Sequence, residues 1–258
     1  MSNAPITRAV FNQKGGVGKT TIVCNLAAAA VARGKRTLVV DLDMQGNASR
    51  YLLGDQPVER DISDFFASTL NFSLGSTPFE AYCTPSIWDG LDVVAAGGEL
   101  EHLQSKLEAK QKVHKLRQAL RKLQHYDQIL IDTPPSFNFY SRSALIAADE
   151  VLIPFDCDDF ARQALYGLLE NIAELREDHN ESLRVGGIIV NQFQSRARLP
   201  RQLVEALRSE GLPILEPMLP SSVVVRESHE AGQPLAWFAP RHRVTEAFDA
   251  LYQTLHRA

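Results

Sequence analysis

The chain has 258 residues, of which 45% are hydrophobic and 22% are charged, and its formal net charge is −4. These values are ordinary for a globular protein, and they exclude a disordered chain, a collagen-like repeat and a small disulfide-stabilised scaffold. Because basic residues are not in global excess, a contact with nucleic acid would need a local basic patch.

Short apolar runs alternate along the chain with longer stretches that have helical spacing. The runs cover residues 6–11, 37–42, 91–95, 128–131, 151–155 and 187–190. Continuous runs rich in Val, Ile and Leu are typical of strands that are buried on both faces. Strands that alternate with helices form βαβ units. The sequence therefore predicts an α/β fold with a mostly parallel central sheet flanked by helices on both faces, in one domain over residues 1–258.

A glycine-rich segment follows the first apolar run. Residues 11–21 read FNQKGGVGKTT and precede an Ala-rich helical stretch over residues 22–32. The glycines let backbone N–H groups turn toward phosphate oxygens, and the helix N-terminus adds its dipole. Lys19 would reach the β and γ phosphates, and Thr20 would offer its hydroxyl to Mg²⁺. The residues expected to contact a nucleotide are Gly15, Gly16, Val17, Gly18, Lys19, Thr20 and Thr21.

The strict phosphate-loop pattern G-x-x-x-x-G-K-[ST] is not met here. Gln13 stands where its first glycine would be, and Lys14 directly precedes Gly15 and Gly16. A glycine-rich turn without a ligand is the alternative interpretation. The ordered occurrence of two lysines, three glycines and two threonines favours a phosphate site.

Two carboxylates follow the second apolar run. Asp41 and Asp43 are two residues apart at the end of that strand, so they share one of its sides. The alternative is that both cap the following turn.

The middle of the chain carries the clearest helical spacing. Leucines recur every three or four residues between residues 99 and 124, which predicts one helix with a buried stripe and a basic opposite face. Residues 55–90 contain Pro57, Pro78 and Pro85, and we expect loops and short helices there.

Five segments together resemble one family. Their sequences are KGGVGKTT at residues 14–21, VVDLDMQGNAS at 39–49, ILIDTPP at 129–135, VLIPFDCD at 151–158 and VVRESHEAGQPL at 224–235. They are similar to the motifs of the ParA/MinD family of deviant Walker A ATPases, and most of all to those of chromosomal ParA proteins. The resemblance spans nearly the whole chain. It implies a P-loop NTPase fold and Mg²⁺-dependent hydrolysis of ATP by a dimer.

The resemblance assigns roles to residues near the phosphates. Lys14 would reach across an ATP-sandwiched homodimer to the partner's phosphates, like an arginine finger supplied in trans. Asp43 would position the attacking water, and Asp41 would organise the loop and Lys14. Asp132 would hold Mg²⁺ through water, and Thr133 and Pro134 would form a switch that senses the γ-phosphate.

The resemblance also suggests where the base lies. Asn191 would read adenine, with Pro220 lining the pocket, and a helix or turn cap is the alternative role for Asn191. The sequence departs from the family at Met44, where proline is usual, and at SHEAG, which replaces SEAPS.

Chromosomal ParA proteins bind DNA without sequence preference, as ATP dimers, through C-terminal basic residues. The matching candidates here are Arg196, Arg198 and Arg226. From Arg184 onward nine Arg face seven Asp and Glu, so this part carries 9 − 7 = +2 and the remainder −6. Surface ion pairs with nearby glutamates are the alternative, and the basic face of the helix over residues 99–124 is a rival DNA surface.

The resemblance favours a DNA-partitioning or cargo-positioning ATPase in the cytoplasm, associated with the nucleoid. Its expected cofactors are ATP and Mg²⁺, and its expected partners are a second copy of the chain, nonspecific DNA and a ParB-like protein or cargo adaptor. We expect no helix-turn-helix domain before the phosphate loop.

The main alternative is a MinD-like membrane-associated ATPase, which needs a basic amphipathic tail. The apolar residues of the tail, Phe248, Leu251, Tyr252 and Leu255, instead predict a helix that docks on the core, so we expect no membrane contact. An electron-transfer role like that of the nitrogenase iron protein needs cysteines near DTPPS, where the sequence has none. A ligase related to dethiobiotin or cobyrinate synthesis would need a substrate pocket that the sequence does not reveal.

Overall fold

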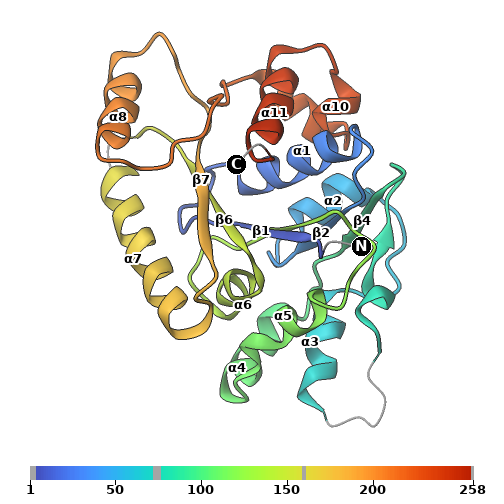
Figure 1. Cartoon of the computed structure of the whole chain (residues 1–258). Coiled ribbons are helices and arrows are strands. Elements are labelled where there is room, and N and C mark those ends of the chain that lie inside the picture. Colours follow the sequence, from blue (N-terminus) through green and yellow to red (C-terminus); the bar gives the residue numbers. More distant parts are fainter. Residues whose placement is uncertain (1–3, 72–76, 159–160, 257–258) are drawn as a thin grey trace.

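The computed structural model describes residues 4–71, 77–158 and 161–256, and it contains a seven-stranded sheet of order β3-β4-β2-β5-β1-β6-β7 (Figure 1). The strands are β1 (Ile6–Val10), β2 (Thr37–Asp41), β3 (Thr84–Pro85), β4 (Leu91–Val94), β5 (Gln128–Asp132), β6 (Glu150–Phe155) and β7 (Arg184–Val190). All neighbouring strands pair in parallel except β3, which runs antiparallel at one edge. The predicted fold class is confirmed.

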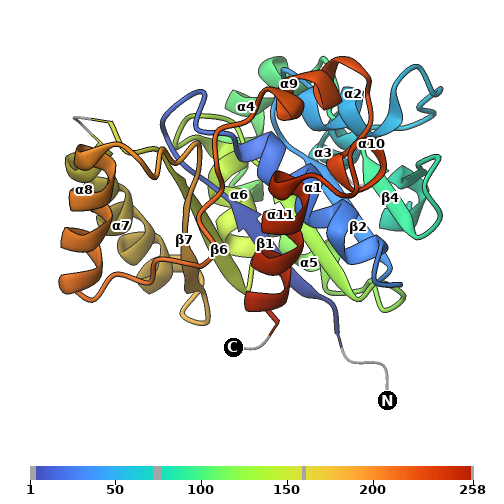
Figure 2. The same cartoon turned by 90° about the horizontal axis from the view of Figure 1, so that it is seen from above.

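Helices cover both faces of the sheet (Figures 1 and 2). One face carries α1 (Lys19–Val31), α2 (Asn47–Leu53), α10 (Leu235–Phe238) and α11 (Arg243–Thr254), with α9 (Val223–Glu230) above them. The other carries α3 (Ile62–Leu70), α4 (Leu100–Ala109), α5 (Lys115–Leu120), α6 (Phe139–Ala147), α7 (Ala161–His179) and α8 (Arg198–Ser209), with 3-10 turns at Phe79–Tyr82 (η1) and Lys112–His114 (η2).

Alternation along each strand divides the core into two apolar clusters. On β1, Ala9 belongs to the cluster under α3–α8, whereas Val10 belongs to the cluster under α1, α2, α10 and α11. Successive side chains of a strand point to opposite faces, so a strand covered on both faces is apolar at most of its positions. This explains why the runs in the sequence are continuous.

The predicted single helix over residues 99–124 is wrong in one respect. Its leucines are buried as expected except Leu103, which is half-buried, but Gln111 adopts a left-handed φ of 52° and divides the segment into α4, η2 and α5. The turn lets both helices pack on α6, which a straight helix of that length could not do. The spacing of leucines resumes after the break, and therefore the sequence pattern did not show it.

The C-terminal helix α11 docks on the core as predicted. Phe248, Leu251 and Tyr252 are at most 5% exposed and pack in the cluster that contains α1. The buried guanidinium of Arg8 on β1 donates to the carbonyl of Leu255 at 3.0 Å, which fixes the end of the helix. In the part of the chain that the structure describes, no helix is long and apolar enough to cross a membrane.

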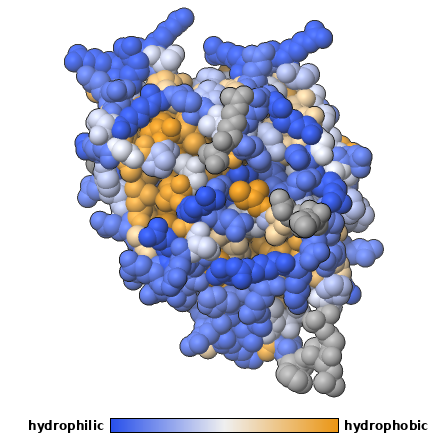
Figure 3. Space-filling model, viewed as in Figure 1, coloured by the Kyte–Doolittle hydropathy of each residue, from blue (hydrophilic) through white to orange (hydrophobic). Residues whose placement is uncertain are grey.

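The surface seen in Figure 3 is mostly hydrophilic, with apolar residues gathered in a band near β7 and α7. Val204 and Leu207 of α8 are buried, and Leu203, Leu212 and Ile214 pack partly buried against the same core. The apolar side of α8 therefore faces inward, and its arginines lie on the outer side.

Candidate functional site

The phosphate loop lies between β1 and α1, at the carboxyl edge of the sheet. Gly16 and Gly18 have φ values of 77° and 89°, a left-handed conformation that glycine adopts without strain. A Cβ at Gly18 would stand 2.2 Å from Nδ2 of Asn191. That amide donates to the carbonyl of Val17 at 2.9 Å, so β7 braces the loop from the side.

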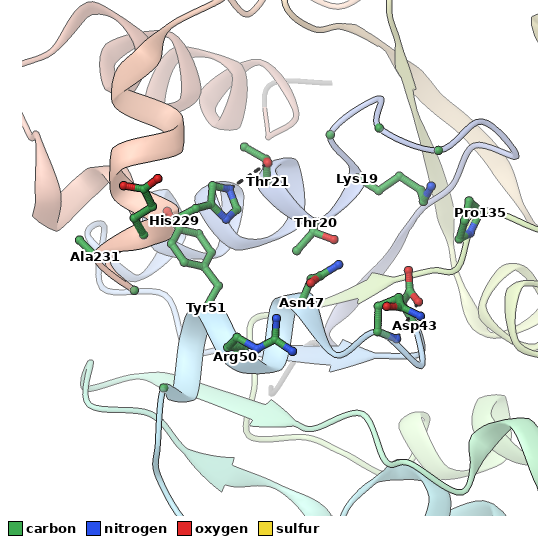
Figure 4. Close-up of a pocket in the computed structure, with 17 residues that line it drawn as sticks. Lys19, Thr20, Thr21, Asp43, Asn47, Arg50, Tyr51, Pro135, His229 and Ala231 are labelled. Atoms are coloured by element: carbon green, nitrogen blue, oxygen red, sulfur yellow. Dashed lines mark hydrogen bonds between the residues drawn. The ribbon is translucent and has the colours of Figure 1, made fainter.

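A cavity of about 860 Å³ opens in front of this loop (Figure 4). Lys19 and Asp43 lie at one end, and Arg50, Tyr51 and His229 lie at the other. The remaining lining residues are Gly15, Gly16, Gly18, Thr20, Thr21, Gln45, Asn47, Gly54, Pro135, Glu230, Ala231 and Gly232. The expected nucleotide contacts of the loop thus share one cavity, except Val17, which is fully buried beneath it.

Lys19 and Thr20 begin helix α1 and face the end of β5. The ammonium of Lys19 donates to the carbonyl of Lys14 at 3.2 Å, and the hydroxyl of Thr20 donates to Oδ2 of Asp132 at 2.7 Å. Burial lowers the pKa of Lys19, although the charges of Asp132 and Asp43 oppose that shift. Lys19 is 7% exposed, and the low dielectric of a buried site strengthens the attraction of its ammonium for an anion.

The oxygen donors of this site suit Mg²⁺. Asp132 is fully buried, and burial and the nearby charge of Asp41 raise its pKa well above the usual value, so a cation there would offset an unfavourable charge. Within the described residues, no three His, Cys, Asp or Glu side chains are grouped to hold a metal. Mg²⁺ is usually bound by one or two protein oxygens together with phosphates and water, and Thr20 and Asp132 offer such oxygens.

Asp41 organises the turn that follows β2. Its carboxylate accepts hydrogen bonds from the backbone N–H of Asp43 at 3.1 Å and from both the N–H and the hydroxyl of Ser49. In the strand register Asp41 lies beside Asp132, which brings two carboxylates together. Asp43 is 8% exposed and lines the cavity.

Asp41→Asn is expected to remove a pH-dependent component of stability. Burial raises the pKa of Asp41 to about 6, above the ordinary value of 3.8, so the folded chain binds this proton more tightly than the unfolded chain. The group therefore opposes folding above pH 6, and this penalty diminishes as the pH falls toward 4. The free energy of unfolding of the native chain, minus that of D41N, should grow by about 2 kcal/mol between pH 7 and pH 4.5 in urea titrations. A difference that does not change with pH would contradict this.

Lys14 does not line the cavity of its own phosphate loop. Its ammonium makes ion pairs with Asp156 at 2.6 Å and with Asp158, both just after β6. Burial lowers the pKa of Lys14, but the hydrogen bonds to the two carboxylates outweigh this and raise it. The sequence pattern gave no indication of this pairing.

A second cavity of about 500 Å³ adjoins the first and contains both residues predicted to bind the base. Asn191 and Pro220 line it together with Val225, Arg226 and Val244. Five residues, Gly16, Gly18, Thr21, His229 and Glu230, line both cavities. A ligand with phosphates in one cavity and a base in the other would cross between them at these five.

The predicted switch lies under the phosphate cavity. Thr133 is 1% exposed, and its hydroxyl donates to the carbonyl of Val10 at 2.7 Å, which ties the end of β5 to the end of β1. Pro134 is buried and Pro135 reaches the cavity.

The three predicted DNA-contact arginines are all exposed, but they lie on separate elements. Arg196 and Arg198 are at the start of α8, beside α7, whereas Arg226 is on α9, near α2 (Figure 2). Arg226 lines the cavity that contains Asn191 and Pro220, whereas Arg198 lines a third cavity. Asn191 and Gln192 line both of these cavities.

Several cavity residues were not predicted from the sequence, and among them are Arg50, Tyr51 and His229. His229 lies in the SHEAG segment, and the departure of this segment from the family pattern was the one sequence feature that pointed to it. Arg50 and Tyr51 follow the second motif and carried no signal of their own.

Comparison with known proteins places this site in a family. A family model described as an AAA domain matches residues 6–185. The chromosome partitioning protein ParA of Myxococcus xanthus is 34% identical over 249 residues, which are 95% of this chain and 86% of that protein. The chromosome-partitioning ATPase Soj of Thermus thermophilus is 34% identical over 253 residues, covering 97% and 96%. The chain belongs to the ParA/MinD family of ATPases.

Solved structures share the fold of this chain. The ADP- and magnesium-bound cobyrinic acid a,c-diamide synthase of Mycobacterium smegmatis is 26% identical, with a TM-score of 0.82 over 98% of this chain and 94% of that one. MinD of Pyrococcus furiosus, at 23% identity, has a TM-score of 0.77 and covers 99% of both chains, which shows the shared fold. As a member of the ParA/MinD family, the chain is an ATPase that uses ATP and Mg²⁺.

Proposed function

We propose that this chain is an ATP-dependent DNA-partitioning or cargo-positioning ATPase of the cytoplasm, associated with the nucleoid. ATP joins two copies, the dimer binds DNA without sequence preference, and a ParB-like protein or cargo adaptor stimulates hydrolysis and release. The observation that carries this proposal is the position of Lys14. Its ammonium pairs with Asp156 outside the phosphate cavity of its own chain, and in a dimer it could act on the γ-phosphate bound by the second copy.

Within each phosphate cavity we propose distinct roles. Lys19 neutralises the phosphates, and Thr20 and Asp132 hold Mg²⁺, with Asp132 acting through water because it is fully buried. Asp43 positions the attacking water. Bound Mg²⁺ supplies charge neutralisation at the phosphate oxygens.

The remaining nucleotide contacts follow from the second cavity. Asn191 and Pro220 contact adenine, since both line it beside the phosphate loop. Thr133 and Pro134, with Asp41, report the γ-phosphate to the carboxyl ends of β1, β2 and β5. Two hydrogen bonds tie these ends together: Thr133 donates to the carbonyl of Val10, and the N–H of Leu42 donates to the carbonyl of Asp132.

Arg196, Arg198 and Arg226 are proposed to contact DNA phosphates. Replacing Arg198 with Glu is expected to weaken binding of random duplex DNA about tenfold at 0.1 M salt and to reduce the slope of log affinity against log salt by about 1. Fluorescence anisotropy with ATP measures both. Arg121→Glu is the matched control. Arg121 precedes β5, at the amino ends of the parallel strands, whereas Arg198 follows β7, at their carboxyl ends. A larger loss in R121E than in R198E would move the DNA surface to α4 and α5.

The structure offers little to a membrane-bound alternative. The apolar residues of α11 are buried in the core, so this helix has no exposed apolar face that could insert into a bilayer surface. Sedimentation with anionic vesicles and ATP should leave the chain in the supernatant, and co-sedimentation would favour the MinD-like role.

A diamide synthase activity is the second alternative, named by the M. smegmatis structure at 26% identity. The partition relatives are more similar, at 34% over nearly the whole chain. ATP turnover assayed with cobyrinic acid and glutamine discriminates the two: amide product would overturn the proposal, and turnover stimulated by DNA would support it.

A further inference from the structure

Two cavities meet at a narrow junction beside the phosphate loop. At that junction the side chains of Thr21 and His229 contact each other, and Thr21 Oγ1 lies 3.0 Å from His229 Nε2. If phosphates occupy the larger cavity and adenine the smaller, the ribose and α-phosphate must pass Thr21. This step rests on the proposed placement of the nucleotide.

The imidazole of His229 is held firmly in place (Figure 4). Its ring stacks on Tyr51, with centroids 4.1 Å apart and planes 15° from parallel. Tyr51 is 3% exposed, and its hydroxyl contacts the hydroxyl of Ser228 at 2.9 Å and donates to the carbonyl of Gln233 at 3.1 Å. Because the stack on Tyr51 already restricts the imidazole, little further side-chain entropy is lost when the ring forms a hydrogen bond to a neighbouring residue.

The contact determines what the hydroxyl of Thr21 can do. A hydroxyl has one hydrogen to donate and two lone pairs. When Nε2–H of His229 donates to Oγ1, the hydrogen of Thr21 remains free for a phosphate oxygen. In the opposite tautomer Thr21 would donate to the ring and lose that hydrogen. Burial lowers the pKa of His229, which favours the neutral ring.

We propose that His229 is a nucleotide-positioning residue: by donating to Thr21, it aims the threonine hydroxyl at the α-phosphate of bound ATP or ADP. His229 acts through Thr21 and contributes to binding. The chemical step at the γ-phosphate lies at the other end of the cavity, beside Lys19 and Asp43.

Two substitutions separate the hydrogen bond from the packing of the ring. H229F keeps an aromatic ring on Tyr51 but has no donor, whereas H229Q places an amide nitrogen near the former Nε2. We expect H229F to weaken binding of ADP with Mg²⁺ about tenfold and H229Q to stay within about threefold of the native chain. The KM for ATP should rise in H229F in parallel, with the single-turnover rate at saturating ATP unchanged. Equal losses in H229F and H229Q would overturn the proposal.

A double-mutant cycle tests whether His229 acts through Thr21. T21A should weaken ADP binding about tenfold, and T21A/H229F should be no weaker than T21A alone to within about twofold. Multiplied losses in the double variant would show that the two residues act independently and would overturn the proposal. H102F, at an exposed histidine of α4, is the matched control and should bind ADP like the native chain.

The outcomes distinguish this inference from the proposed function. A native chain that does not bind ADP with Mg²⁺ would overturn both. A native chain that binds ADP while H229F binds equally well would overturn only the role of His229. Thermal unfolding midpoints confirm that each variant is folded before its affinity is measured.

Discussion

Replacing Lys14 with alanine is expected to slow single-turnover hydrolysis of ATP by about 10²–10³-fold, because a cation supplied in trans contributes in this range or above it in phosphoryl transfer. Binding of ATP by one chain should change by less than about threefold, since Lys14 lies outside that chain's phosphate cavity. Rapid quenching of ATP hydrolysis at high protein concentration measures the first quantity, and equilibrium binding of ATP measures the second.

Mixing two inactive variants shows whether the lysine acts on the partner. K14A retains Asp43 but supplies no lysine, and Asp43→Ala supplies Lys14 but does not position water. In a mixed dimer the K14A site would receive Lys14 from the D43A chain. Hydrolysis restored on mixing supports action in trans, and a mixture as inactive as its components contradicts it.

Gly18→Ala is expected to abolish measurable nucleotide binding, with a loss of at least about 30-fold in affinity for ADP, and to destabilise the fold by about 2 kcal/mol or more. Its φ of 89° is strained for any residue with a Cβ, and that Cβ would stand 2.2 Å from Nδ2 of Asn191. Relief of the clash would displace the amide that braces Val17. Urea unfolding and ADP titration measure the two effects.

Gly15 provides the matched control for stability. Among the described residues other than its two chain neighbours, no atom lies within 4 Å of the position that its Cβ would take, and its φ is not left-handed. G15A should therefore change the free energy of unfolding by less than about 0.5 kcal/mol. Equal destabilisation by G15A and G18A would show that the contact with Asn191 is unimportant.

The strands were predictable from the sequence because strands buried on both faces consist mainly of apolar residues. A parallel strand covered on both faces is apolar along most of its length, and six such runs match β1, β2 and β4 to β7 closely. The two-residue edge strand β3 contains Pro85 and is not an apolar run, so the sequence did not predict it. The break at Gln111 was missed because the buried leucines keep helical spacing on both sides of it.

The phosphate loop was also predictable, because short-range geometry fixes which residues can surround a phosphate. Contacts between segments far apart in the chain were not. The ion pairs of Lys14 with Asp156 and Asp158 join residues more than 140 positions apart, and the stack of Tyr51 on His229 joins α2 to α9. Neither pair forms a pattern that one sequence can show.

Binding of random-sequence duplex DNA with ATP, with ADP and without nucleotide, across a series of salt concentrations, shows whether an ATP-bound dimer is the DNA-binding form. We expect binding only with ATP, and an affinity that falls steeply as salt rises. Binding that is the same in all three nucleotide states, or no binding in any of them, would contradict the proposal that an ATP-bound dimer is the DNA-binding form.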